Sequence, residues 1–165
     1  MAVTAAELIG SQVARFVDRR GDWDAFADAR VEGFRRAQHR FIGPGASGKS
    51  DAHVIPAEHF TLSVMFVPVG QGNAAHTHEV EEVFFILRGQ VMVFFEDEGG
   101  GRAEATLGAW DCVSCPAGVV HGYHNAGLEP AYLQVMLGKA RPDLMNYQDA
   151  ELQGRRTEHL VAPKA

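Results

Sequence analysis

The chain has 165 residues, enough for one compact domain with a hydrophobic core and too few for two. Its formal net charge of −6 argues against nucleic acid as a partner, because phosphate binding requires clustered Lys and Arg. The longest apolar runs have five residues, as in Val83–Leu87, and the N-terminus lacks a basic stretch before an apolar core, so we expect a cytoplasmic protein with no membrane span and no signal peptide.

Residues 1–59 are predicted to form an N-terminal helical extension. Thr4 and Glu7 have the spacing of a capping box, in which the two side chains satisfy free backbone amides at a helix start. Apolar residues follow at helical spacing: Leu8, Ile9, Val13, Phe16 and Val17. We expect this helix to end at Gly21 and a second short helix to cover residues 22–30, both packing on the rest of the domain or on a partner subunit.

A further strand is predicted just after these helices, and it carries four cationic or titratable residues. They are Arg35, Arg36, His39 and Arg40. Such side chains are most often solvated. On an extra strand they could also cap a pocket and attract a carboxylate.

Residues 43–58 are rich in Gly, Pro, Ser and Ala and are predicted to form a loop. Within it, Gly43–Ser50 matches the phosphate-binding pattern G-x-x-x-x-G-K-[ST]. That site requires a helix starting at Lys49, whose backbone amides would bind phosphates. Pro56 follows closely and no helical apolar stripe precedes it, so we do not expect nucleotide hydrolysis.

From residue 60 the apolar pattern changes to a period of two, and residues 60–140 are predicted to be all-β. Short apolar segments alternate with glycine turns, which is typical of an antiparallel barrel or jelly roll. The expected strands are 60–66, 83–88, 90–96, 102–107, 110–114, 119–124 and 131–137. Residues 141–165 are predicted to form a short C-terminal helix over 143–153 and then a tail.

Cys112 and Cys115 are spaced as C-x-x-C, a pattern that in redox proteins stands at a helix N-terminus. Here Pro116 and Gly118 follow in a segment predicted as strand and turn. Residues three apart on a strand face opposite sides. We therefore interpret both cysteines as reduced and structural.

The segment Gly70–Gly89 indicates a metal site. His76 and His78 are two residues apart, so on an extended strand both side chains project from the same face. Glu82 follows after a short turn and can reach the same point. Two imidazoles and a carboxylate suit Fe, Mn, Ni, Zn or Co.

A second segment, Gly108–Asn125, contains Pro116, Gly118, His121 and Asn125. Together the two segments resemble the two sequence motifs of the cupin family, with a loop two residues longer between Gly108 and Pro116. The resemblance covers about residues 60–138 and implies a β-barrel that binds one divalent metal ion. By this resemblance the ligands are His76, His78, Glu82 and His121, and a homodimer is expected, as for many similar cupins.

Strand parity predicts the walls of the pocket around the metal. If Glu82 and His121 point inward, then Phe84, Ile86 and Tyr123 do so as well. By the same argument His124 points outward. The predicted pocket is apolar and aromatic, with the Tyr123 hydroxyl as its polar group.

The ligand set leaves the reaction open, because four protein ligands on an octahedral ion leave positions for substrate or dioxygen. We favour a mononuclear Fe(II) dioxygenase acting on a small aromatic or carboxylate compound. With Mn, Ni or Zn, a non-redox decarboxylase, isomerase, hydrolase or lyase is the alternative. A barrel that binds a small molecule without converting it is the remaining hypothesis, and the sequence assigns no catalytic residue beyond Tyr123 as a candidate.

Overall fold

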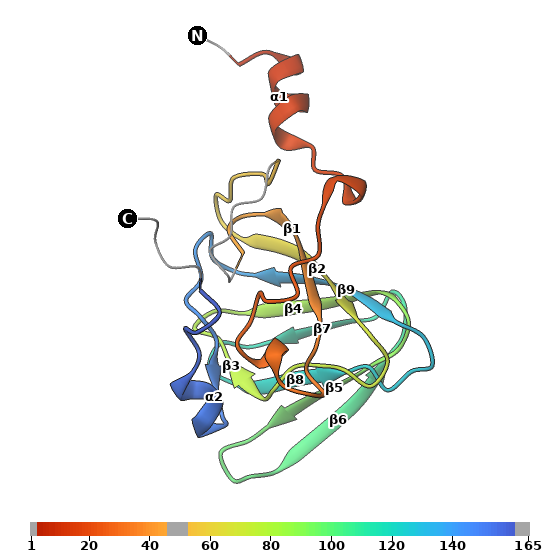
Figure 1. Ribbon diagram of the computed structural model, residues 1–165, viewed down its shortest axis with the longest axis vertical. Coiled ribbons are helices and arrows are strands. Elements are labelled where there is room, and N and C mark those ends of the chain that lie inside the picture. Colours follow the sequence, from red (N-terminus) through yellow and green to blue (C-terminus); the bar gives the residue numbers. More distant parts are fainter. Residues whose placement is uncertain (1–2, 46–52, 161–165) are drawn as a thin grey trace.

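A computed structural model describes residues 3–45 and 53–160, which form two five-stranded antiparallel sheets (Figure 1). In the first sheet the strand order is β1 (Ala37–Ile42), β2 (Thr61–Val67), β9 (Ala131–Leu137), β4 (Glu82–Arg88) and β7 (Cys112–Cys115). In the second sheet the order is β10 (Asn146–Tyr147), β3 (His76–Thr77), β8 (Val120–His124), β5 (Val91–Glu96) and β6 (Arg102–Leu107). The predicted all-β antiparallel architecture is confirmed.

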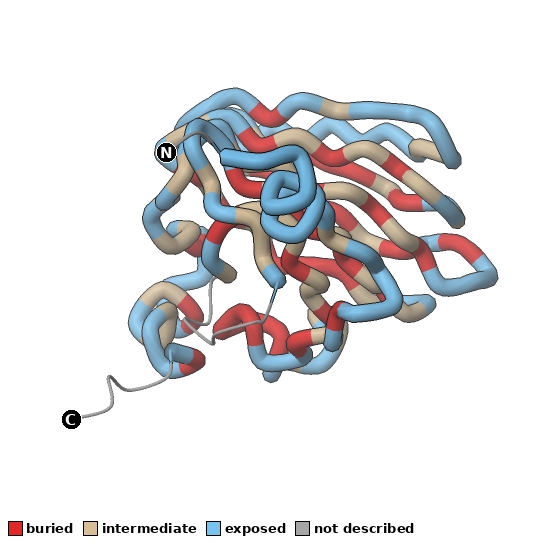
Figure 2. The backbone as a smooth tube through the Cα atoms, turned by 90° about the horizontal axis from the view of Figure 1, so that it is seen from above, coloured by how far each residue is buried: buried red, intermediate tan, exposed pale blue. Residues whose placement is uncertain are grey.

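The hydrophobic core lies between the two sheets. Residues that alternate along β2, β4 and β9 meet residues of β5 and β8, as the period of two predicts. Phe84, Ile86 and Leu133 are at most 1% exposed. Figure 2 shows the buried residues (red) alternating with intermediate and exposed ones along much of the backbone.

The N-terminal helix α1 (Ala5–Gln12) begins at the predicted capping box, with the Thr4 hydroxyl accepting from the Glu7 amide. The prediction that it continues to Gly21 is wrong. Val13 is already extended, and only the 3-10 turn η1 (Phe16–Asp18) follows. No residue of α1 is buried, and the helix projects away from the sheets (Figures 1 and 2).

The predicted second helix over 22–30 is also wrong, since the segment contains only the 3-10 turn η2 (Asp28–Arg30). Asp22 instead exchanges two backbone hydrogen bonds with Gln38 of β1, at 2.9 and 3.0 Å. Its carboxylate accepts from Arg40. Pairing of Asp22 with β1 therefore anchors the start of this segment, and turns and bends follow it in place of a regular helix.

Strand β1 is the extra strand that the sequence predicts, but its cations are not all solvated. Arg36, just before β1, is 1% exposed, and Arg40 is 6% exposed. Each is paired with a buried carboxylate, Arg36 with Asp28 and Arg40 with Asp22. The expectation that such residues are solvated therefore fails for both.

The C-terminal helix α2 covers only Ala150–Gly154, much less than the predicted 143–153. Residues 146–147 form β10 instead, in which Tyr147 pairs with His76 of β3. Asp149 caps α2 by accepting a hydrogen bond from the Leu152 amide. Pairing with β3 therefore delays the helix by seven residues.

The P-loop-like segment, the two cysteines and the expected absence of a membrane span complete the comparison with the sequence. Most of the P-loop-like segment, residues 46–52, lies outside the described residues, as does the end of the predicted tail, 161–165. Cys112 is exposed and Cys115 buried, and both are free thiols. Within the described residues, no helix is long and apolar enough to cross a membrane.

Candidate metal centre

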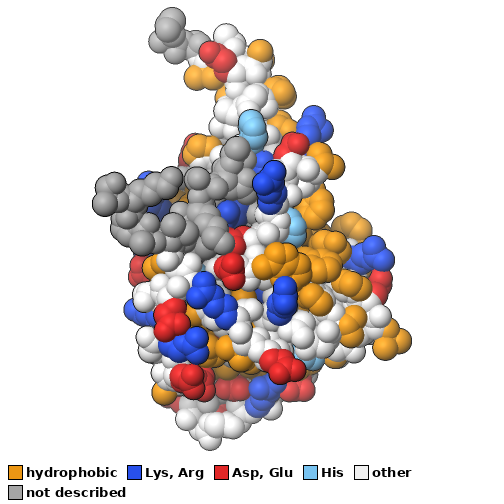
Figure 3. All heavy atoms as spheres, in the orientation of Figure 1, with side chains coloured by type: hydrophobic (Ala, Val, Ile, Leu, Met, Phe, Trp, Pro, Cys, Tyr) orange, Lys and Arg blue, Asp and Glu red, His pale blue; other side chains and the backbone are white. Residues whose placement is uncertain are grey.

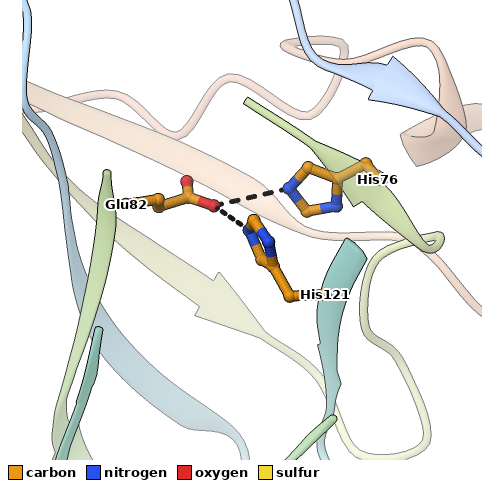
Figure 4. A group of neighbouring side chains, drawn as sticks. All are labelled: His76, Glu82 and His121. Atoms are coloured by element: carbon orange, nitrogen blue, oxygen red, sulfur yellow. Dashed lines mark hydrogen bonds and ion pairs between the residues drawn. The ribbon is translucent and has the colours of Figure 1, made fainter. Parts of the chain in front are cut away.

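Three predicted ligands meet between the two sheets (Figure 4). His76 of β3 and His121 of β8 are direct partners across an antiparallel pair, so their rings lie side by side. Glu82, the first residue of β4, reaches them from the other sheet. Its Oε2 atom lies 3.4 Å from Nε2 of His76 and 2.9 Å from Nε2 of His121. All three side chains are buried.

The hydrogen bonds of the two rings define their tautomers. Nδ1 of His76 lies 2.9 Å from the Ala74 carbonyl, and Nδ1 of His121 lies 2.8 Å from the Val119 carbonyl. A carbonyl only accepts, so each Nδ1 carries the hydrogen and the neutral ring presents a lone pair at Nε2. Each Nε2 atom thus faces the Glu82 carboxylate oxygen, at a distance that a shared proton or a bound metal ion would bridge.

His78 lies next to this group. Its Nε2 is 3.5 Å from Oε2 of Glu82, yet neither ring nitrogen has a hydrogen-bond partner among the described residues, and the side chain is 5% exposed. Burial lowers the pKa of His78 to about 4. The imidazole is therefore neutral at pH 7 and, as a buried group without a hydrogen bond, fits a metal ligand.

Glu82 is ionised in this setting. Burial opposes its charge, but His78, His121 and His76 outweigh that effect and hold the pKa of the carboxyl well below its usual range. The group thus combines one carboxylate with three imidazoles, and these residue types fit a divalent ion.

The glycines and Asn125 of the two segments hold the ligand-bearing strands together. The Gly118 amide donates to the His78 carbonyl, and the Gly70 amide donates to the Asn125 carbonyl. Gly118 and Gly89 have φ values of 77° and 82°, where a side chain would be strained. The Asn125 amide group is fully buried and donates to backbone carbonyls. These residues therefore position the ligands rather than contact them.

A cavity of about 310 Å³ lies beside the ligand group, and three of the four predicted ligands, His76, His78 and Glu82, line it. Phe84 and Tyr123 line it, whereas Ile86 is fully buried in the core and is not among the lining residues. His124, which the alternation of side chains along β8 places on the outward face, does not line the cavity either. This volume suits a small organic molecule.

The comparisons with known proteins agree with this geometry. The family model described as "Cupin domain" matches residues 63–137, which include all four predicted ligands and strands of both sheets. The chain belongs to the cupin superfamily. Among curated proteins, none matches the chain.

Several solved structures are similar to this cupin. TT1209 from Thermus thermophilus is 30% identical over 52% of this chain and 78% of that one, with a TM-score of 0.46. Oxalate decarboxylase from Lactobacillus farciminis, in a formate complex, is 15% identical over 81% of this chain, with a TM-score of 0.60. An oxalate oxidase is 15% identical over 72% of this chain, with a TM-score of 0.55. This chain spans only 35% of the decarboxylase and 57% of the oxidase, and the likeness to these two shows the fold alone.

The cavity of this cupin is more polar than the alternation of side chains along the strands predicts. Besides Tyr123, its walls include several polar side chains. These are Arg36, Gln38, Thr61, Ser63, Asn73, Asp143, Tyr147, Arg156 and His159. Along β2, the side chains that point inward include those of Thr61 and Ser63, which are both buried. A period of two shows that the two faces differ but does not show which one is inward.

Arg36 and Asp28 form a buried pair on one side of the cavity. Nη2 of Arg36 lies 2.9 Å from Oδ1 of Asp28, which also accepts from the Tyr147 hydroxyl at 3.1 Å. The other carboxylate oxygen accepts from the Ala74 amide, and the Ala74 carbonyl holds Nδ1 of His76. The pair therefore supports the loop that orients a ligand, and sequence reasoning missed it.

Proposed function

We propose that this cupin is a mononuclear enzyme that uses a divalent metal ion, favouring Fe(II), as a dioxygenase acting on a small organic acid. His76, His78, Glu82 and His121 would hold the ion. The observation that carries the proposal is the convergence of the His76 and His121 Nε2 atoms on the buried Glu82 carboxylate, beside a cavity that His76, His78 and Glu82 line. When bound there, Fe(II) would supply one-electron chemistry with dioxygen.

The residues around the ligands support an enzyme over a simple binding protein. Burial raises the pKa of the Tyr123 hydroxyl, so at neutral pH it keeps its proton and can donate to a substrate oxygen in the cavity. Phe84, Met65 and Val135 contribute apolar wall that excludes water. A hydrogen-bond donor and apolar side chains beside the ligands would orient a substrate at the metal, which favours turnover over simple binding.

The names of the fold neighbours are consistent with a carboxylate substrate. One is an oxalate decarboxylase and others are oxalate oxidases, one of them in complex with the substrate analogue glycolate. Since that likeness concerns the fold, the proposal for this chain rests on its own cavity, which contains cationic and hydroxyl side chains.

Oxygen consumption tests the choice of reaction. Metal-free protein is loaded separately with Fe(II), Mn(II), Ni(II) or Zn(II) and mixed with a panel of small carboxylic acids and catechols. We expect oxygen uptake with Fe(II) and at least one acid, and none with Zn(II), which has no redox chemistry. The His121→Ala variant is the control and should consume none.

Uptake that is absent with every metal would contradict the dioxygenase proposal. In that case product formation without oxygen uptake would favour the non-redox alternative, in which Mn, Ni or Zn acts as a Lewis acid. Binding of an acid without any product would favour a small-molecule-binding cupin.

We also propose that the cupin forms a homodimer through the N-terminal extension, by way of α1 and the residues between α1 and β1. Apolar side chains on and after α1 are exposed, among them Ile9 at 68% and Val17 at 86% (Figure 3). Contiguous apolar residues that a monomer leaves in water mark an interface. We place the dimer in the cytoplasm, where free Cys112 and Cys115 stay reduced.

Introducing negative charges into this apolar segment by substitution is expected to dissociate the dimer. Because Ile9 and Val17 are exposed within the chain, the double change Ile9→Asp and Val17→Asp should leave the melting temperature of the monomer nearly unchanged. Light scattering should show a dimer for the native chain and a monomer for the variant. Leu128→Asp, at a fully exposed loop position, is the control, and a monomeric native chain would contradict the proposal.

A further inference from the structure

The segment that follows the barrel closes the cavity. Residues 142–159 lie after the part of the chain that matches the family model, yet they supply lining residues from Pro142 to His159. The segment is fixed next to the ligands, because Tyr147 of β10 pairs in register with His76 of β3. Its side chains therefore have a defined place in the same cavity as the ligands.

Arg156 of this segment is a cation in the cavity wall without a carboxylate partner. Its Nη1 donates to the Asn146 side-chain carbonyl, a neutral group, and no carboxylate among residues 3–45 and 53–160 forms an ion pair with it. The neighbouring Arg155 differs, since it pairs with Glu151 and Glu158 and does not line the cavity. Arg156 is half-buried, so its charge is only partly solvated.

Hydrogen bonds connect the side chain of Arg156 to β10, the strand beside the ligands, and so orient it. Asn146, its partner, also accepts from Nε2 of Gln153 at 3.3 Å. Oε1 of Gln153 accepts from the Tyr147 amide at 2.8 Å. The guanidinium is thus connected through two amide side chains to the residue that pairs with His76. Such support from neighbouring hydrogen bonds is typical of a side chain held for recognition.

The other charges of the cavity do not neutralise Arg156. Arg36 is compensated by Asp28. Asp143 is exposed, and together with the closer Glu79 it raises the pKa of Lys139. Glu82 faces the three imidazoles at the far side of the ligand group. His159, three residues after Arg156 and 5% exposed, adds a second nitrogen-bearing group to the same wall.

From this arrangement we infer that Arg156 binds a carboxylate of the substrate, and that the substrate is a small diacid. One end of the diacid would chelate the metal, and the second carboxylate would meet the guanidinium, whose planar fork matches a carboxylate. The inference rests on the proposed metal site and makes its substrate class more specific. A cavity of about 310 Å³ is consistent with a compact molecule that has groups at both ends.

Matched probes separate the second carboxylate from the metal-binding end. Malate and 2-hydroxybutanoate share a 2-hydroxy acid and differ in a terminal carboxylate or methyl group, and 2-hydroxyglutarate and 2-hydroxypentanoate form a longer pair. Dissociation constants are measured by calorimetry on native protein and on the Arg156→Met and Arg155→Met variants. Metal content is determined in every sample.

We expect native protein to prefer the diacid of at least one pair by roughly 10-fold or more, the size of a charge-assisted hydrogen-bonded contact. Arg156→Met should abolish the preference, whereas Arg155→Met should keep it, and both should retain native metal content. The assignment of Arg156 would be overturned if metal-loaded native protein bound the diacid no more tightly than its monoacid partner. It would also be overturned if Arg156→Met kept the preference for the diacid. Native protein that holds no metal would instead contradict the metal site, and the diacid preference of that protein would still report on Arg156.

Discussion

Replacing His121 with alanine is expected to abolish metal binding. The ring of His121 makes the shortest contact with Glu82, 2.9 Å, and packs against the rings of both His76 and Phe84. Substitutions that only disturb a ligand's hydrogen bond typically weaken metal binding about 10–100-fold, so loss of the ligand itself should exceed about 100-fold. Elemental analysis should find about one divalent ion per native chain and none in the variant.

His124→Ala is the matched control for this experiment. His124 lies on the same strand, three residues along, but it is half-buried and belongs to the other face of β8. Its removal should leave the metal content unchanged. Full metal content in His121→Ala, or equal losses in both variants, would contradict the ligand assignment.

Replacing Asp28 with alanine is expected to cause the largest loss of stability of any single substitution considered for this cupin. Asp28 is fully buried and is the only carboxylate, among the described residues, that pairs with the 1%-exposed Arg36. Removing one member of a buried ion pair leaves an uncompensated charge and typically costs about 3–5 kcal/mol. Chemical denaturation should show that decrease in the free energy of unfolding.

The surface pair of Arg88 and Glu129 provides the control. Its 2.8 Å contact is as short as that of the buried pair, but its side chains are 67% and 51% exposed. Exposed pairs contribute about 0–1 kcal/mol, so Glu129→Ala should change stability by no more than that. A loss in Asp28→Ala as small as in Glu129→Ala would show that Arg36 finds water or another partner.

His76, His78 and Glu82 could be grouped from the sequence because strand geometry is local, whereas His121 joins them only through the resemblance to cupins. On a strand, residues two apart share a face, so the spacing of His76 and His78 already indicates a common target. Gly89 and Gly118 mark turns because only glycine adopts their positive φ without strain. Local rules of this kind place each motif on its strand before the fold is known.

The supporting charges could not be predicted, because their environment depends on contacts distant in sequence. Asp22 and Arg40 are 18 residues apart, and nothing between them indicates that the fold buries both. The same contacts prevent the helix expected over 22–30, since Asp22 pairs with β1. Arg156 lies beyond the last predicted strand, in a segment whose sequence shows no relation to His76.

Anomalous diffraction from crystals of protein purified without chelator tests the central claim most directly. We expect one strong peak at the absorption edge of the bound metal, between the imidazoles of His76, His78 and His121 and the carboxylate of Glu82. The same data would identify the element, with iron expected. A site without a peak, or a peak coordinated by other residues, would contradict the metal centre on which the proposed function rests.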